Sequence, residues 1–225
     1  MAEKAEKKSG SSKLTAFLEK NRKGVLITFI VVVVLVAGFV CVELIKASAT
    51  KKNLAAIEAY YYDLVEIPAD TEDSEINKLA TECIENLADY TKKGGIAGVR
   101  ANMLSAELAY ILADYEATVN YYDAAIAKGK KSYTAPLCMY NKAVALEELN
   151  RLDEAAQAYK DAAEFPSFGM ASHAYFSYGR VLETKGDLSG AVEAYKTLTD
   201  KFTDDEWANV AKTKLIDLKT KGKIE

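Results

Sequence analysis

Residues 175–198 have the sequence YFSYGRVLETKGDLSGAVEAYKTL, with apolar and small side chains at helical spacing on both sides of Gly186. The small residues Gly179 and Ala191 allow two helices to approach each other closely, and Tyr195 supplies a bulky ring to fill the space between them. The segment therefore predicts an antiparallel pair of α-helices joined by a short turn.

The same pattern occurs twice more upstream. Residues that directly follow a turn are Tyr115, Leu152 and Leu188, at spacings of 37 and 36 residues. The position seven residues after each of these is a tyrosine, namely Tyr122, Tyr159 and Tyr195. Counted from the same three residues that follow a turn, the third position after them is small in each repeat (Thr118, Ala155 and Ala191). The ninth position before them is also small (Ala106, Ala143 and Gly179). This periodicity predicts three repeated helix hairpins, at about residues 99–128, 136–165 and 172–201.

These segments resemble tetratricopeptide repeats. In the third segment the residues at the offsets expected for that family are Tyr178, Gly179, Leu182, Gly186, Leu188, Ala191 and Tyr195. In the second segment they are Ala143, Leu146, Leu152, Ala155, Tyr159 and Ala162. The first segment has Ala113 and Thr118 where the family usually has Gly and Ala. The resemblance implies an all-α fold in which residues 96–225 form a solenoid of stacked helix hairpins.

A solenoid needs a terminal element, because its last hairpin otherwise exposes an apolar face. Residues 204–221 are expected to be a C-terminal capping helix. The side chains expected to pack inward are Trp207, Val210, Ala211, Leu215 and Leu218.

Residues 24–42, GVLITFIVVVVLVAGFVCV, are nineteen consecutive uncharged residues, fourteen of which are Val, Leu, Ile or Phe. As a helix they span about 28 Å, close to the ~30 Å hydrocarbon core of a bilayer. We therefore expect an N-terminal transmembrane helix within residues 24–45. Between it and the repeats, residues 46–95 are expected to form a membrane-proximal helix pair, with helices at residues 53–67 and from Ser74 to Gly94-Gly95.

Basic residues predict the orientation of this span. Residues 1–23 hold seven Lys or Arg, whereas Lys46, Lys51 and Lys52 follow the span. The positive-inside rule then makes residues 1–23 a flexible, basic cytoplasmic tail and places the C-terminal domain on the extracytoplasmic side. Signal-peptidase cleavage after Ala49 stays open as an alternative, although the charges at Glu43 and Lys46 favour an uncleaved anchor.

Composition and charge exclude several classes of function. Of the 225 residues, 50% are hydrophobic and 28% are charged, which excludes a wholly disordered chain. Residues 1–23 carry a net charge of +4, which leaves 22 basic and 30 acidic residues in the remainder. Because phosphate contacts need clustered Lys and Arg, we expect no nucleic-acid partner.

The sequence offers little chemistry for catalysis. Cys41, Cys83 and Cys138 form no CxxC motif, and His173 is the only histidine. We therefore expect no metal site, and with no phosphate-binding loop, GxSxG or HExxH motif we expect no cofactor, no catalytic residue and no enzyme activity. Whether Cys83 and Cys138 form a disulfide or are buried thiols stays open, because sequence alone gives no Cα distance.

The order of segments in the whole chain narrows the resemblance. A basic tail, one span, an outer helix containing AAIEAYYYDL (residues 55–64), a second helix and then repeats resemble the bitopic tetratricopeptide proteins of bacterial inner membranes. The best-known type is the ancillary subunit of the Sec translocon. The resemblance implies an accessory or scaffold subunit in the inner membrane, acting in protein export or chaperone handover, with the translocon or envelope chaperones as partners. The alternatives are a scaffold for cell division or cell-wall synthesis, and a solute-binding accessory of a transporter.

In this family the concave face is lined by the first helix of each hairpin. Transferred to this sequence, the expected peptide- or protein-binding groove is formed by Arg100, Met103, Glu107, Tyr110, Tyr140, Val144, Glu147, His173, Phe176, Arg180 and Glu183. Aromatic residues bordered by charges of both signs suit an extended or helical peptide. The alternative is that Tyr140 and Phe176 only fill the core. The groove lacks the Lys/Asn clamp with which cytosolic relatives bind carboxylate-terminated chaperone tails.

Overall fold

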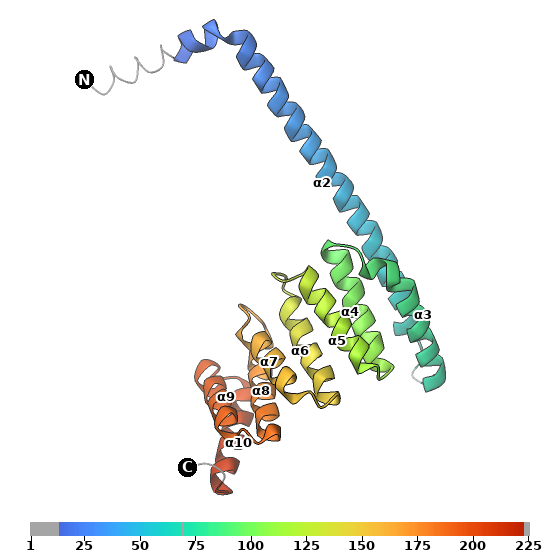
Figure 1. The fold of residues 1–225 in the computed structure, drawn as a ribbon, viewed down its shortest axis with the longest axis vertical. Coiled ribbons are helices and arrows are strands. Elements are labelled where there is room, and N and C mark those ends of the chain that lie inside the picture. The colour runs from blue at the N-terminus through green and yellow to red at the C-terminus, as the bar shows by residue number, and fades with distance from the viewer. Residues whose placement is uncertain (1–13, 69, 223–225) are drawn as a thin grey trace, which may run out of the picture. The chain divides into compact units, whose positions relative to one another are not determined.

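The computed structural model of the protein describes residues 14–68 and 70–222, and these are helical with short connections. The helices are α2 (Arg22–Val65), α3 (Asp73–Thr91), α4 (Gly95–Ile111), α5 (Tyr115–Lys128), α6 (Ala135–Glu148), α7 (Leu152–Glu164), α8 (Ala171–Lys185), α9 (Leu188–Lys201) and α10 (Glu206–Thr220) (Figure 1). The chain divides into two compact units, with the boundary between Lys52 and Asn53 inside α2.

The first unit contains the apolar part of α2. Within the described residues, one helix, covering Arg22–Tyr62, is long and apolar enough to cross a membrane, and its most apolar window is wholly unburied. A cleavable signal sequence would meet the same criteria of length and composition. The predicted flexible tail falls mainly on residues 1–13, which lie outside the described residues. Residues 14–20 are helical, in contrast to that prediction, since LTAFLEK places apolar residues at helical spacing.

The second unit is a row of antiparallel helix hairpins. Each helix from α3 to α10 packs against the next, and α10 also contacts α8. The expectation of an all-α fold built from consecutive hairpins is confirmed. The helix expected at residues 53–67 ends at Val65, two residues earlier, because Pro68 disfavours helical geometry at the residue before it.

The close approaches between helices occur at the small residues of the repeat pattern. Tyr122, Tyr159 and Tyr195 are buried, with 3%, 1% and 0% of their surface exposed. A Cβ atom at Gly179 would lie 2.5 Å from the Tyr195 ring, which explains why glycine occupies this position in the third hairpin. The tyrosine is therefore the plug around which the two helices of a hairpin pack.

The turns inside the hairpins share a further feature. The residue two positions before each second helix has a positive φ: 56° at Ala113, 55° at Asn150 and 83° at Gly186. The left-handed region costs an alanine about 1–2 kcal/mol and costs glycine little. Asp114 and Asp187 then cap α5 and α9 by accepting hydrogen bonds from Ala117 N and Gly190 N.

The capping helix α10 buries a narrower stripe than the sequence predicted. Ala211 and Leu218 are buried, while Trp207 and Leu215 pack partly against the core. The prediction for Val210 is wrong, because 39% of its surface is exposed. It lies one residue, about 100° of helix rotation, from Ala211 and outside the stripe that faces α8 and α9.

The two cysteines of the second unit occupy different core clusters. Cys83 packs near Ile57 and Leu87, and its thiol donates a hydrogen bond to the carbonyl oxygen of Tyr60 at 3.4 Å. Cys138 packs with Met103 and Tyr122, and burial raises its pKa to about 12. These separate environments correspond to the buried-thiol alternative.

Candidate functional site

The first helices of successive hairpins, α4, α6 and α8, bring the predicted groove residues other than Glu183 to three hollows. The central pocket has a volume of about 410 Å³ and contains six of them. These six are Tyr140, Val144, Glu147, His173, Phe176 and Arg180. Glu148, Tyr159, Ser177 and Trp207 also line the central pocket and were not assigned to the groove from the sequence.

The base of the central pocket is aromatic. The His173 ring stacks on Trp207 with centroids 3.9 Å apart and 10° between the planes, and Phe176 lies 5.1 Å from the same indole. Tyr140 contacts both the His173 ring and the Tyr159 ring at 5.1 Å, the latter edge to face. Rings from α6, α7, α8 and α10 thereby form one connected cluster.

The aromatic residues are more buried than an open binding surface requires. Tyr140 and Phe176 each expose 9% of their surface, and both belong to the hydrophobic core of the repeats. Tyr140 and Phe176 therefore do fill the core, as the alternative proposed. Their remaining exposed surface lines the central pocket. The Tyr140 hydroxyl also lies 3.1 Å from His173 Nε2, so the polar end of this side chain has an internal partner.

Glu147 is the polar centre of the central pocket. Its carboxylate accepts hydrogen bonds from both terminal nitrogens of Arg180, at 2.6 and 2.7 Å, and from the buried Tyr159 hydroxyl at 2.7 Å. Planar two-point pairing of this kind is the strong form of an arginine–carboxylate interaction. It raises the pKa of Arg180. Three consecutive helices are thus joined through one carboxylate (α6, α7 and α8).

The next hairpin repeats this arrangement. Glu183 on α8 accepts a hydrogen bond from the Tyr195 hydroxyl at 3.2 Å and pairs with Lys214 of α10 at 3.2 Å. In both hairpins the plug tyrosine follows the glutamate by 12 residues. Glu183 therefore lies outside the residues that line the central pocket, and its carboxylate holds the cap against the third hairpin.

These predicted groove charges have partners inside the protein. Glu147, Arg180 and Glu183 are predicted to orient a ligand, and in the structure Glu147 pairs with Arg180 of α8 while Glu183 pairs with Lys214 of α10. Sequence spacing could not reveal this, because the pairing depends on how far each hairpin is rotated against the next. The exposed carboxylate beside the central pocket is that of Glu148, whose contact with the Tyr110 hydroxyl is 3.5 Å long.

The surroundings of His173 favour the neutral form of its imidazole ring. Burial against the aromatic cluster, together with the nearby positive charge of Arg180, lowers its pKa. The imidazolium form is disfavoured because it would lose hydration and lie beside a fixed guanidinium. His173 consequently serves as an aromatic and hydrogen-bonding group at neutral pH.

The remaining predicted residues lie in two hollows nearer α2. Glu107 and Tyr110 line a hollow of about 290 Å³ that also contains Val144. Burial raises the pKa of Glu107. Arg100 and Met103 line a half-open cavity of about 690 Å³, which we call the N-terminal cavity.

Arg100 also has an internal partner. Its guanidinium donates hydrogen bonds to both oxygens of Glu58, at 2.6 and 3.0 Å. This pair joins α2 to α4 as the Arg180–Glu147 pair joins α8 to α6.

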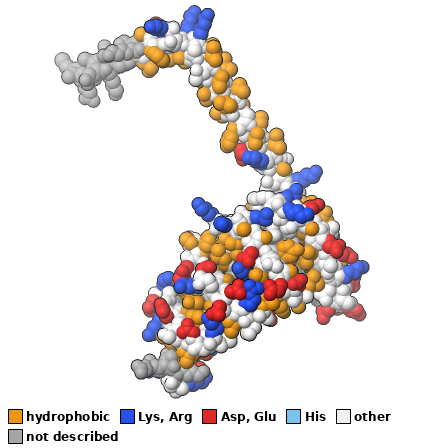
Figure 2. Space-filling model, in the orientation of Figure 1, with side chains coloured by type: hydrophobic (Ala, Val, Ile, Leu, Met, Phe, Trp, Pro, Cys, Tyr) orange, Lys and Arg blue, Asp and Glu red, His pale blue; other side chains and the backbone are white. Residues whose placement is uncertain are grey.

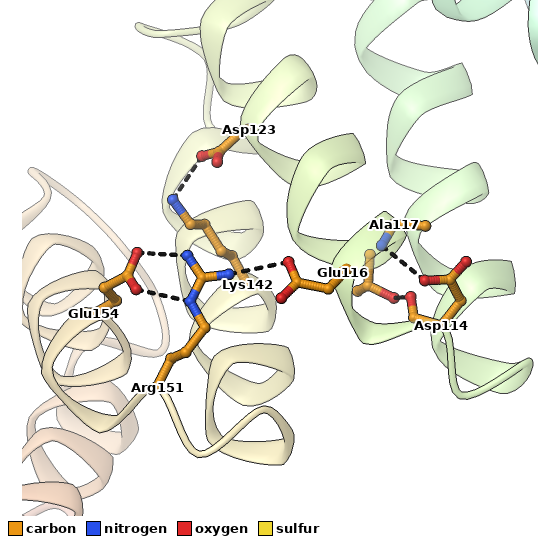
Figure 3. Close-up of polar contacts among 8 residues, drawn as sticks. Asp114, Glu116, Ala117, Asp123, Lys142, Arg151 and Glu154 are labelled. Atoms are coloured by element: carbon orange, nitrogen blue, oxygen red, sulfur yellow. Dashed lines mark hydrogen bonds and ion pairs between the residues drawn. The ribbon is translucent and has the colours of Figure 1, made fainter.

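On the outer side of the hairpins, ion pairs continue from one repeat to the next. Arg151 donates to Glu154 at 2.7 Å and to Glu116 of the preceding hairpin at 3.1 Å, and Lys142 pairs with Asp123 at 2.6 Å (Figure 3). The carboxylate partners are more than half exposed, so each pair contributes at most about 1 kcal/mol. They fix the spacing of neighbouring hairpins rather than form a binding site.

A sequence profile described as the tetratricopeptide repeat-like domain matches residues 15–220. The chain belongs to this family. A relative from Treponema pallidum (strain Nichols), described as a TPR repeat-containing protein, is 27% identical over 139 residues, which is 62% of this chain. The chain spans 58% of the length of that relative.

Among solved structures, one similar fold is that of a Podosopora anserina protein described as having nearly identical TPR-like repeats. It is 12% identical, with a TM-score of 0.56 over 77% of this chain and 89% of that chain. At this identity the likeness shows the fold alone. The resemblance of the three hairpin segments to tetratricopeptide repeats is confirmed at the level of the family, whose repeats typically act as interaction scaffolds.

In this tetratricopeptide repeat-like protein, α10 packs against α8 and α9 and brings Trp207 into the central pocket. Tyr140, His173 and Trp207 follow one another at spacings of 33 and 34 residues and line the same pocket. From the sequence Trp207 was assigned to core packing of the cap, and in the structure it packs partly against the core and also lines the central pocket. Within residues 14–68 and 70–222, no group of three or more His, Cys, Asp or Glu side chains could hold a metal ion.

Proposed function

We propose that the protein is a membrane-anchored interaction module whose central pocket binds a peptide or protein segment. The observation that carries this proposal is the aromatic cluster of the central pocket, open on one side and bordered by the exposed Glu148. Peptide anchors gain most of their affinity from burial against such rings, and a nearby charge orients them. A cationic or aromatic side chain of the partner fits this pocket best, since the Arg180 charge is already neutralised by Glu147.

The anchor in this proposal is the apolar segment at residues 24–42, with the N-terminus in the cytoplasm and the repeats on the periplasmic side of the inner membrane. The asymmetry of Lys and Arg around the segment supports this orientation. Tethering restricts the repeats to a thin layer beside the bilayer. The effective concentration near membrane partners rises accordingly, and individually weak contacts suffice.

We place the protein as an accessory subunit of an envelope machine, in protein export or chaperone handover at the translocon. The support for this role is the resemblance of the segment order to bitopic tetratricopeptide proteins of inner membranes. The half-open N-terminal cavity gives no particular support to a solute-binding role, for which a closed cavity was expected.

The test is photo-crosslinking in living cells from positions that the structure leaves accessible. A photoreactive amino acid replaces Val144 or Glu148, which line the central pocket. The matched control replaces Gln157, an exposed residue on α7 that does not line it.

Capture of a translocon subunit or an exported chaperone from positions 144 and 148, and not from 157, is the expected result. Equal capture from all three positions would exclude the pocket as the binding site. Capture of cytosolic proteins alone would contradict the proposed orientation of the anchor.

A further inference from the structure

Where α3 to α6 turn at one end of the repeat domain, the connections are basic and contain no acidic residue. The antiparallel hairpins place the α3–α4 and α5–α6 connections at the same end. These segments, residues 92–96 and 128–134, contain the five lysines Lys92, Lys93, Lys128, Lys130 and Lys131 and no Asp or Glu. We call this surface the lysine edge.

Most of these lysines form no ion pair with any carboxylate among residues 14–68 and 70–222. Among the described residues, Lys92 pairs with Asp89, and Lys93 lies over the Tyr90 ring. No carboxylate in the described part of the chain forms an ion pair with Lys128, Lys130 or Lys131. The lysine edge therefore holds cationic groups that folding leaves uncompensated.

Large apolar side chains accompany the lysines. Ile96 exposes 54% of its surface and Tyr133 exposes 83%. Both line the N-terminal cavity, whose walls include Leu54, Val99 and Leu137. A surface that combines exposed aromatic and aliphatic groups with lysines has the composition of a membrane-interface contact.

The opposite end of the same helices has the reverse charge. Residues 66–75, around the α2–α3 connection, contain five Asp or Glu and no Lys or Arg. Figure 2 shows Lys and Arg side chains along one end of the domain and Asp and Glu at the end of the α2–α3 connection. An anionic surface would attract the first end and repel the second, so this distribution of charge favours one orientation.

We propose that the lysine edge docks on the anionic lipid headgroups of the membrane in which the chain is anchored. The inference rests on the proposed anchor. Leu54, at the start of the second unit, lines the same cavity as Ile96 and Tyr133, so the chain enters the domain at this end. The ten residues 43–52 between the apolar segment and this unit reach at most about 36 Å, which keeps the edge within range of the headgroups.

The consequence is a fixed orientation of the binding groove. A lysine near an anionic bilayer contributes about fivefold to the docking equilibrium at physiological salt. With several lysines the docked state dominates. The helices of the hairpins then point away from the bilayer surface, and the acidic end around the α2–α3 connection faces away from the lipid. The central pocket would lie at a set height above the bilayer.

The experiment uses the full chain in nanodiscs that contain lipids brominated in the acyl chain, which quench nearby tryptophan. The Tyr133→Trp variant adds a reporter at the lysine edge, and Trp207 in the wild-type chain reports on the central pocket. In phosphatidylcholine mixed with phosphatidylglycerol we expect strong quenching of the added fluorescence and little quenching of Trp207. In phosphatidylcholine alone the quenching of the variant should fall severalfold.

Charge reversal supplies the decisive comparison. Lys130→Glu with Lys131→Glu, on the reporter background, should shift the docking equilibrium by about 25-fold or more and abolish the added quenching. The matched control is Lys196→Glu with Lys219→Glu, two exposed lysines on α9 and α10 with the same change in net charge, and it should leave quenching unchanged. Equal quenching in both lipid mixtures, or equal effects of the two double variants, would overturn the proposal.

A separate experiment tests whether the apolar segment anchors the chain in the membrane. Full chain that is released from vesicles by alkaline carbonate is not inserted, which would refute the proposed anchor. The released chain then tests the lysine edge by itself. Salt-sensitive cosedimentation with phosphatidylglycerol vesicles, lost in Lys130→Glu with Lys131→Glu, would support it, and no cosedimentation would refute it.

Discussion

Replacement of Glu147 by alanine tests whether one carboxylate joins three helices. The substitution removes the acceptor of the Tyr159 hydroxyl, which is buried, and leaves that donor unpaired. A buried hydrogen bond to a charged group contributes about 1.5–3 kcal/mol. The Arg180 side chain is 42% exposed, so loss of its ion pair adds no more than about 1 kcal/mol. We expect Glu147→Ala to lower the free energy of unfolding by about 2–3 kcal/mol.

The assay is thermal unfolding of the full chain in detergent, followed by circular dichroism at the helical band. For a domain of this size the expected loss corresponds to a fall in Tm of about 5–10 °C. Glu148→Ala is the matched control, because the neighbouring carboxylate is exposed and its contact with Tyr110 is 3.5 Å long. Its Tm should change by less than about 2 °C.

A double-mutant cycle with Tyr159→Phe separates the hydrogen bond from general disruption. Once Glu147 is alanine, loss of the Tyr159 hydroxyl should cost little, since its partner is already gone. A coupling free energy of about 1–2 kcal/mol is expected. Strict additivity of the two substitutions, or a Glu147→Ala variant as stable as Glu148→Ala, would refute the role assigned to this carboxylate.

Three further predictions follow from single sites. Ala113→Gly should raise the free energy of unfolding by about 0.5–1 kcal/mol in the same thermal assay, because Ala113 has a φ of 56°; a loss of stability would contradict this. Since the pKa of His173 is lowered on folding, wild-type stability should fall as the pH drops below the ordinary value of 6.5, and the Tm difference between about pH 7 and pH 5 should be smaller in His173→Gln. Cys138, with a pKa of about 12 and 1% exposure, should resist maleimide at neutral pH until the domain is unfolded by urea, as detected by mass spectrometry; rapid labelling of the native protein would show that this part of the core opens.

The sequence by itself determined the hairpins, because their signals are local. Helical periodicity marks which side of a segment is apolar, and the positions of Gly179 and Tyr195 depend only on contacts inside one hairpin. The same holds for the turn at Gly186, where glycine accepts a φ of 83° at little cost. The nineteen uncharged residues 24–42 were likewise evident without any structure.

Only the tertiary structure decided how the groove residues are used. Periodicity places Glu147 and Arg180 on the same face of successive repeats but does not say whether they meet. The rotation between hairpins, set by packing of whole helix surfaces, brings them to 2.6 Å and makes them partners of each other. The same rotation carries Trp207 from the cap into the central pocket and joins the lysines of two separate connections into one edge. Contacts between repeats depend on geometry summed over many side chains, which no local spacing contains.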